Sequence, residues 1–158
     1  MDDVIDQLCP AVMALPGAGD GDYGREYCGV IYTLDDGIYY SSFPSPLGPT
    51  VLTVASKRKQ CHIPAVVKDP RGTPGLKADF HGHPWGPSPM SDKDRRADTQ
   101  IYFVRIQFDS RCQLMKLIPH TKDERPGELF VREGKEWRLV GRILPEDKAT
   151  GTVTLVKE

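Results

Sequence analysis

The sequence has no apolar run long enough to span a bilayer and no excess of charge of either sign. Its 158 residues include 21 basic and 22 acidic side chains, which give a formal net charge of −1. A general electrostatic attraction to nucleic acid or to acidic membranes is therefore not expected. The first residues, MDDVIDQL, lack the basic start and the apolar stretch of a secretory signal. We expect a soluble protein with neither nucleic-acid nor membrane partners.

The sequence also lacks a recognisable cysteine motif. The four cysteines, Cys9, Cys28, Cys61 and Cys112, are widely spaced, and none belongs to the C-x-x-C pair typical of structural zinc or redox sites. The sequence thus predicts reduced thiols and a cytoplasmic location, with secretion by a route that needs no signal as the alternative.

Turn-forming residues are plentiful, with 14 prolines and 15 glycines. Apolar residues near helical spacing predict a helix over 3–15, ended by Pro16 and Gly17, although Pro10 interrupts the stripe. Aromatic and β-branched runs on both sides of 35–37 predict a hairpin. Further patterns predict a strand at 77–83, a helix at 91–98, and strands at 101–108, 112–119, 128–134, 136–144 and 151–158.

This order of elements predicts a single α+β domain over residues 1–158 in which strands dominate. A chain of this length can bury one core of its own. Residues 43–76 are proline-rich and irregular, and we interpret them as one helix or strand with long loops rather than as a linker between domains.

The stretch FHGHPWGPSPMSDKD, residues 80–94, is the most informative part of the chain. Side chains alternate between the two faces of a strand, so His81 and His83 are expected on the same side. Two imidazoles on one face form half of a tetrahedral zinc site, which needs a third ligand from another element. Taken alone, this pair could also be two partly exposed histidines that bind no metal.

Asp94 supplies the third ligand if Ser91 caps the predicted helix, because Asp94 then lies in its first turn beside the end of the strand. The S-x-x-D spacing alone is also an ordinary capping pattern. A hydrolytic zinc site further needs a base that accepts a proton from water and returns it. Glu26, just before the predicted hairpin, is the candidate base. The alternative role for Glu26 is that of a solvent-facing charge at the end of a strand.

These residues form one ordered pattern, which comprises Glu26, Cys28, Gly29, His81, His83, Pro84, Ser91 and Asp94. The pattern resembles the JAMM motif of the JAB/MPN family of zinc metalloproteases, and the spacing H-x-H-x7-S-x2-D matches it completely. The resemblance covers about residues 20–112. Gly82 departs from it, since the family usually has serine or threonine there, and the 43–76 segment cannot be aligned to the family.

The resemblance implies a single MPN/JAB-like domain, similar to cytidine deaminases, with a mixed but mainly antiparallel sheet flanked by helices. It implies that His81, His83 and Asp94 bind one Zn²⁺ per chain, that Glu26 is the catalytic base and that Ser91 stabilises the oxyanion. The activity implied is that of a prokaryotic-type, deubiquitinase-like isopeptidase. Its partner would be a ubiquitin-like protein, cut at its carboxyl terminus in a conjugate or a precursor.

Other functions remain compatible with the motif. A zinc peptidase of this type could act on non-ubiquitin peptides, such as cell-wall or phage-tail substrates, or as a toxin-type effector. A metal-free MPN-like domain would serve as a scaffold, although every motif position is filled here. A cytidine deaminase would need a P-C-x-x-C pattern, which the sequence lacks. Trp85, directly after the motif's proline, is expected either to line a substrate groove or to anchor its own loop.

Overall fold

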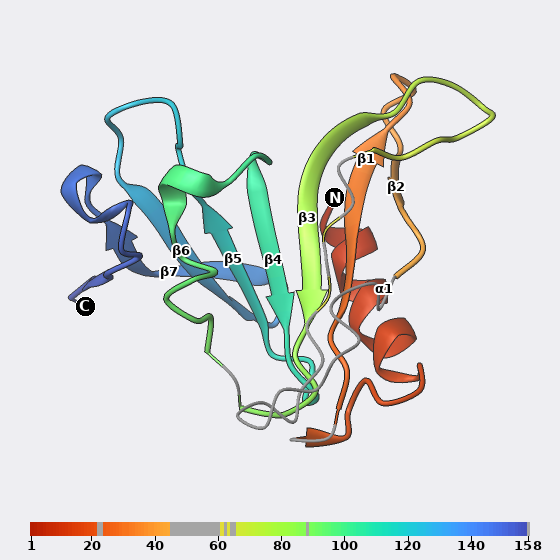
Figure 1. Ribbon diagram of the computed structural model, residues 1–158, viewed down its shortest axis with the longest axis horizontal. Coiled ribbons are helices and arrows are strands. Elements are labelled where there is room, and N and C mark those ends of the chain that lie inside the picture. The colour runs from red at the N-terminus through yellow and green to blue at the C-terminus, as the bar shows by residue number, and fades with distance from the viewer. Residues whose placement is uncertain (22–23, 45–60, 62, 64–65, 88, 158) are drawn as a thin grey trace.

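The computed structural model describes residues 1–21, 24–44, 61, 63, 66–87 and 89–157. Within these residues the chain forms strands β1 (Tyr27–Thr33), β2 (Tyr39–Ser41), β3 (Gly75–Gly82), β4 (Val104–Phe108), β5 (Leu114–Ile118), β6 (Gly127–Glu133), β7 (Glu136–Ile143) and β8 (Thr154–Leu155). All eight belong to one open sheet in the order β2-β1-β3-β4-β5-β6-β7-β8 (Figure 1). The sheet is mixed, because β3 and β4 run parallel and every other described pair is antiparallel.

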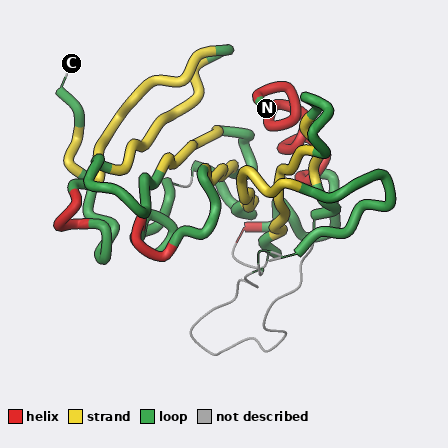
Figure 2. Tube along the Cα trace, turned by 90° about the horizontal axis from the view of Figure 1, so that it is seen from above, coloured by secondary structure: helices red, strands yellow, loops and turns green. Residues whose placement is uncertain are grey.

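Helices contribute less than the sequence predicted. The described residues contain one α-helix, α1 (Asp2–Met13), and two short 3-10 helices, η2 (Ala97–Thr99) and η3 (Pro145–Asp147). The prediction of a mainly antiparallel sheet is confirmed, but the protein is mostly sheet rather than a sheet flanked by several helices. The two termini lie toward opposite ends of this sheet (Figures 1 and 2).

The predicted helix over 91–98 is wrong. Arg95 N donates to the Ser91 carbonyl, which closes a single turn, but the backbone is already extended at Arg96. A continued helix would bond Asp98 N to the Asp94 carbonyl, but Asp98 N donates to the Lys148 carbonyl, and the Asp94 carbonyl accepts from Gln100 and Arg105. Tertiary hydrogen bonds therefore replace the continuation of the helix.

The predicted hairpin is confirmed. β1 and β2 pair antiparallel, and the turn between them contains Asp35 and Gly37 with positive φ angles of 62° and 75°. Aspartate and glycine tolerate this region better than most residues, which is why their cluster marks a turn. Of the irregular 43–76 segment, residues 45–60, 62 and 64–65 lie outside the described part of the chain, and the rest includes a bridge between Asp69 and Gly72.

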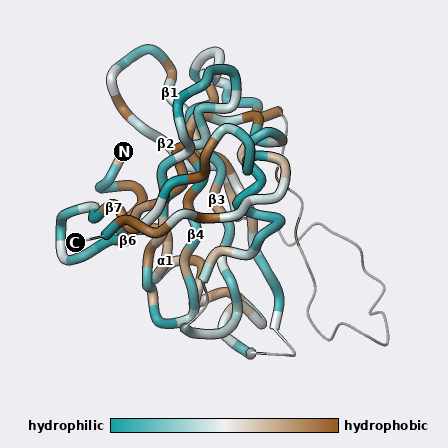
Figure 3. Tube along the Cα trace, turned by 90° about the vertical axis from the view of Figure 1, so that its left-hand side faces the viewer, coloured by the Kyte–Doolittle hydropathy of each residue, from teal (hydrophilic) through white to brown (hydrophobic). Residues whose placement is uncertain are grey.

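α1 covers one face of the sheet. Its buried side chains, among them Ile5, Leu8 and Val12, join a core cluster with Phe80 of β3 and Phe108 of β4. The stripe continues through Pro10, so the helix predicted over 3–15 is confirmed with slightly different ends. Figure 3 shows the hydrophobic stretches gathered on α1 and the central strands.

The connection between the parallel strands β3 and β4, residues 83–103, crosses the opposite face. Parallel neighbours cannot be joined by a tight turn and need a crossover of a dozen residues or more. Met90 and Ala97 of this crossover are buried with Leu117, Leu129 and Ile143 of the sheet. The crossover therefore carries residues 84–96 over the face that α1 leaves uncovered.

Two disulfide bonds correct the prediction of reduced thiols. Cys9 of α1 pairs with Cys112, and Cys28 of β1 pairs with Cys61, with Cα–Cα distances of 5.6 and 5.7 Å. The partners are 103 and 33 residues apart in sequence, so no local spacing could reveal them. Disulfides persist mainly in oxidising compartments. The predicted cytoplasmic location depended on reduced thiols and loses that support. Within the described residues, no helix is both long enough and apolar enough to cross a membrane.

We expect the Cys9→Ser/Cys112→Ser variant to lose roughly 2–5 kcal/mol of unfolding free energy. The bond closes the longer loop, so its removal should cost ~1 kcal/mol more than Cys28→Ser/Cys61→Ser in the chain-entropy estimate. Urea unfolding of both variants and of the wild type measures the difference. Equal stability of the Cys9→Ser/Cys112→Ser variant and the wild type under oxidising conditions would contradict the pairing.

Candidate metal centre

Two buried histidines lie at the carboxyl end of β3. His81 is the penultimate residue of the strand, and His83 follows its end, where its N–H donates to the Phe108 carbonyl of β4. The side chains of His81 and His83 are 6% and 5% exposed, and their ring centroids are 4.9 Å apart. The alternation of the strand thus places both imidazoles on one side, as the sequence predicted. This is the face opposite α1.

Gly82 faces the other way, and its surroundings explain the departure from the JAMM pattern. A Cβ atom at this position would lie 2.7 Å from Cε2 of Phe108 and 3.2 Å from Cε of Met13. Both side chains belong to the packing between α1 and the sheet. A serine or threonine would therefore need this core to shift, whereas glycine lets α1 and Phe108 approach β3 closely.

Asp94 reaches the histidines from the crossover. Its Oδ2 atom is 3.5 Å from Nε2 of His81 and 3.8 Å from Nε2 of His83. One donor atom from each of the three residues lies within 4.8 Å of the others. The structure thus brings together the three residues that the sequence predicted as ligands, although Asp94 is carried by a single turn and not by a helix.

Ser91 is bound to Asp94 in two ways. Its hydroxyl donates to Asp94 Oδ2 at 2.7 Å, and the Asp94 N–H donates to Ser91 Oγ at 3.2 Å. The second bond is the capping interaction expected of an S-x-x-D pattern. The first orients the carboxylate oxygen that faces the histidines.

The charges of this cluster are strongly coupled. Burial works against protonation of His81, but its contact with the negative Asp94 prevails and raises the pKa of His81. Burial likewise opposes ionisation of Asp94, yet His81, Ser91 and Arg105 together hold the pKa of this carboxyl well below its usual range. Asp94 is therefore a carboxylate at neutral pH, as a metal ligand has to be.

The donor set fits a metal ion. Nε2 of His81 is buried and makes no hydrogen bond to any described residue, although it points toward Asp94. Ligand atoms of a tetrahedral zinc site are about 3.4 Å apart, from bond lengths near 2.1 Å. The two distances from Asp94 Oδ2, 3.5 and 3.8 Å, are close to this value. His81, His83 and Asp94 could therefore hold a metal ion.

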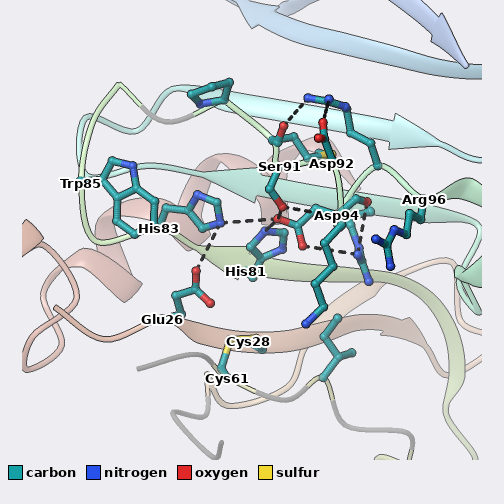
Figure 4. Close-up of a pocket in the computed structure, with 16 residues that line it drawn as sticks. Glu26, Cys28, Cys61, His81, His83, Trp85, Ser91, Asp92, Asp94 and Arg96 are labelled. Carbon is teal, nitrogen blue, oxygen red and sulfur yellow. Dashed lines mark hydrogen bonds and ion pairs between the residues drawn. A yellow bond between two sulfur atoms is a disulfide. The ribbon is translucent and has the colours of Figure 1, made fainter. Parts of the chain in front are cut away.

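Glu26 and Trp85 contact His83 from two sides (Figure 4). Glu26 lies just before β1 and is 8% exposed, and its Oε1 atom is 3.4 Å from Nε2 of His83. The Trp85 ring stacks on the His83 ring with centroids 4.8 Å apart and planes at 18°. The structure therefore places the predicted base beside the ligands, and it gives Trp85 a contact that orients His83.

These side chains line a cavity of about 730 Å³. The Cys28–Cys61 bond forms part of its wall, and in the β1–β3 register Cys28 lies directly opposite His81. The cavity is also bounded by Met90 and by four cationic side chains, Lys93, Arg95, Arg96 and Arg105. It is large enough to receive a chain segment beside the donor set.

Arg105 and Asp79 are residues of this region that the motif did not reveal. Asp79 precedes His81 by two positions and therefore shares its face, and Arg105 lies opposite Asp79 on β4. A charged residue inside the apolar run IYFVRIQF was a usable signal, because a buried arginine requires an anionic partner. The sequence did not identify that partner, since the parallel β3–β4 pairing brings it from 26 residues away.

Comparisons of the chain with protein-family models, with curated proteins and with solved structures found no match. The likeness to the JAMM pattern therefore depends on the motif residues and their spacing.

Proposed function

We propose that this protein is a zinc-dependent hydrolase of the JAMM type that cleaves a peptide or isopeptide bond. The observation that supports it best is the convergence of four side chains from three separate segments. Two imidazoles and one carboxylate could hold the metal, and a second carboxylate, Glu26, lies 3.4 Å from one of the imidazoles. A scaffold without chemistry would not need a second buried acid at this point.

Zinc is the metal that this donor set favours. Two histidines and one carboxylate form a ligand set of catalytic zinc sites, which leaves one position for water or substrate. When bound, the ion supplies a Lewis acid that polarises a carbonyl and acidifies water. His83, stacked on Trp85, and Asp94, bonded to Ser91, are held in place before any ion arrives.

Glu26 is the proposed base. Its Oε1 atom accepts a proton from the attacking water and later delivers it to the departing amine, so the Glu26 carboxylate is regenerated after each cycle. The hydroxyl of Ser91 is the proposed donor to the oxyanion, for which it must turn from Asp94 Oδ2. A single donor of this kind contributes about 3 kcal/mol in comparable sites.

The proposed substrate is the carboxyl-terminal tail of a ubiquitin-like protein, joined to a lysine or to a carboxyl-terminal extension. Small residues suit the positions next to the cut, because Trp85, Met90 and the Cys28–Cys61 bond line the same cavity as the ligands. Bulky side chains would clash with these walls.

A second candidate is a zinc peptidase that acts on other peptides, such as a cell-wall or phage-tail peptidase or a toxin-type effector. The two disulfide bonds favour it, because disulfides form and persist mainly in oxidising compartments.

Incubation of the zinc-loaded, oxidised protein with a ubiquitin-like conjugate, followed by mass spectrometry, tests the proposed substrate. We expect a cut at the carboxyl terminus of the modifier, because the tail is the flexible part that can enter the cavity. Parallel incubation with cell-wall peptides and with an unbiased peptide library tests the second candidate function. If only those substrates are cleaved, the protein is a zinc peptidase that acts on other peptides, and the ubiquitin-like substrate is refuted.

A further inference from the structure

Arg105 and Asp79 form a charged pair under the metal centre. They lie directly opposite each other in the parallel β3–β4 ladder. Arg105 Nη2 donates to Asp79 Oδ2 at 2.8 Å, and Nε donates to both carboxylate oxygens at 3.1 and 3.2 Å. The Asp79 side chain is 1% exposed and that of Arg105 14%. Asp79 therefore fixes two of the three guanidinium nitrogens in place.

The third guanidinium nitrogen is directed at Asp94. Arg105 Nη1 donates to the Asp94 carbonyl at 3.3 Å and lies 3.8 Å from Asp94 Oδ1. Gln100 Nε2 donates to the same carbonyl at 3.2 Å. The two carboxylate oxygens of Asp94 thus have different neighbours. Oδ1 lies near Arg105, whereas Oδ2 faces Ser91 and the two histidines.

We infer that Arg105, held by Asp79, is a positioning residue that orients Asp94 as a ligand through one oxygen. This inference rests on the proposed metal centre. The turn that carries Asp94 is not continued as a helix, so regular secondary structure does not hold the carboxylate against β3. Arg105 does so from the sheet itself, and it contacts neither the proposed base nor the two histidines through any described hydrogen bond.

The energetics of burial support a role beyond folding. A buried ion pair gains little net stability, and an apolar pair of similar size often stabilises a protein at least as well. The fork of an arginine can, however, bind Asp79 and Asp94 at the same time, which the single ammonium of lysine cannot do in this geometry. Groups that orient metal ligands in this way commonly change metal affinity by roughly 10- to 100-fold when replaced.

The test is zinc affinity, measured by competition with a chromophoric chelator, in wild type, Arg105→Lys and Arg105→Gln. We expect Arg105→Gln to bind zinc about 10- to 100-fold more weakly, with Arg105→Lys between the two. The visible absorption spectrum of the Co²⁺-loaded proteins should change as well, because the carboxylate ligand loses its fixed orientation. A loss of stability alone would alter neither the spectrum nor the affinity of the folded protein.

Arg132→Gln is the matched control. Its side chain is 7% exposed and pairs with Asp2 and Asp6 of α1, on the face away from the metal centre. It should keep wild-type zinc affinity and the wild-type Co²⁺ spectrum. If Arg105→Gln does not fold because Asp79 is left unpaired, Asp79→Asn/Arg105→Gln removes both charges, and the same weakened binding is expected of it.

The outcomes separate this inference from the proposed function. A wild-type protein that binds no zinc would overturn the metal centre and everything built on it. A wild type that binds zinc, with unchanged affinity and spectrum in the folded Arg105 variants, would overturn the positioning role alone. Weakened binding of the same size in Arg132→Gln would show that the effect does not depend on the contact between Arg105 and Asp94, and it would also refute the inference.

Discussion

Glu26→Gln is expected to keep both the fold and the bound zinc while its turnover falls by roughly 100- to 10,000-fold. The amide preserves the size and the polar character of the side chain, which is 11% exposed and lies beside His83. It cannot accept a proton from water at neutral pH, so the proposed base is removed without a cavity being opened. Turnover of a confirmed substrate, zinc content and circular dichroism measure the three quantities.

Asp92→Asn is the control for this change. Asp92 lines the same cavity, but its side chain is 78% exposed and pairs with Arg95 at the rim. The same chemical replacement there should leave turnover within a few-fold of the wild type. Should Glu26→Gln work at the wild-type rate, Glu26 is not the base, and another group would have to fill that role.

His81→Ala/His83→Ala is expected to reduce the zinc content from about one ion per chain to near zero. Both imidazoles are buried and face Asp94, so their loss leaves one carboxylate, which cannot hold zinc by itself at micromolar concentration. Elemental analysis of protein purified without added metal gives the stoichiometry. All hydrolysis that depends on the ion should disappear with it.

A described histidine outside the centre, His120, provides the matched control. His120 follows the end of β5, and its Nε2 atom lies 2.9 Å from Oε1 of Glu128 in β6. His120→Ala should lose this pair and keep a full complement of zinc. A wild type with almost no metal, unchanged in the double variant, would refute the metal centre and favour the scaffold alternative.

Much of the candidate site follows from local rules. The alternation of side chains in β3 fixes His81 and His83 on one face whatever the strand packs against. The cluster at 35–37 makes the β1–β2 turn, because the chain there needs positive φ angles. The spacing from His83 to Asp94 also predicts a ligand brought back to the strand, although the helix expected to carry it is replaced by a turn.

By itself, then, the sequence determined which residues share a face, where the chain turns and which side chains are suited to a metal. Only the tertiary structure decided which residues from distant segments contact one another. The Cys9–Cys112 and Cys28–Cys61 pairs, and the position of Arg105 between Asp79 and Asp94, join segments from 11 to 103 residues apart. Local propensities do not encode such contacts, since they depend on strand order and on the path of the crossover, which are set by burial of the whole sheet. Periodicity acts over a few residues, whereas pairing across a sheet is a property of the complete fold.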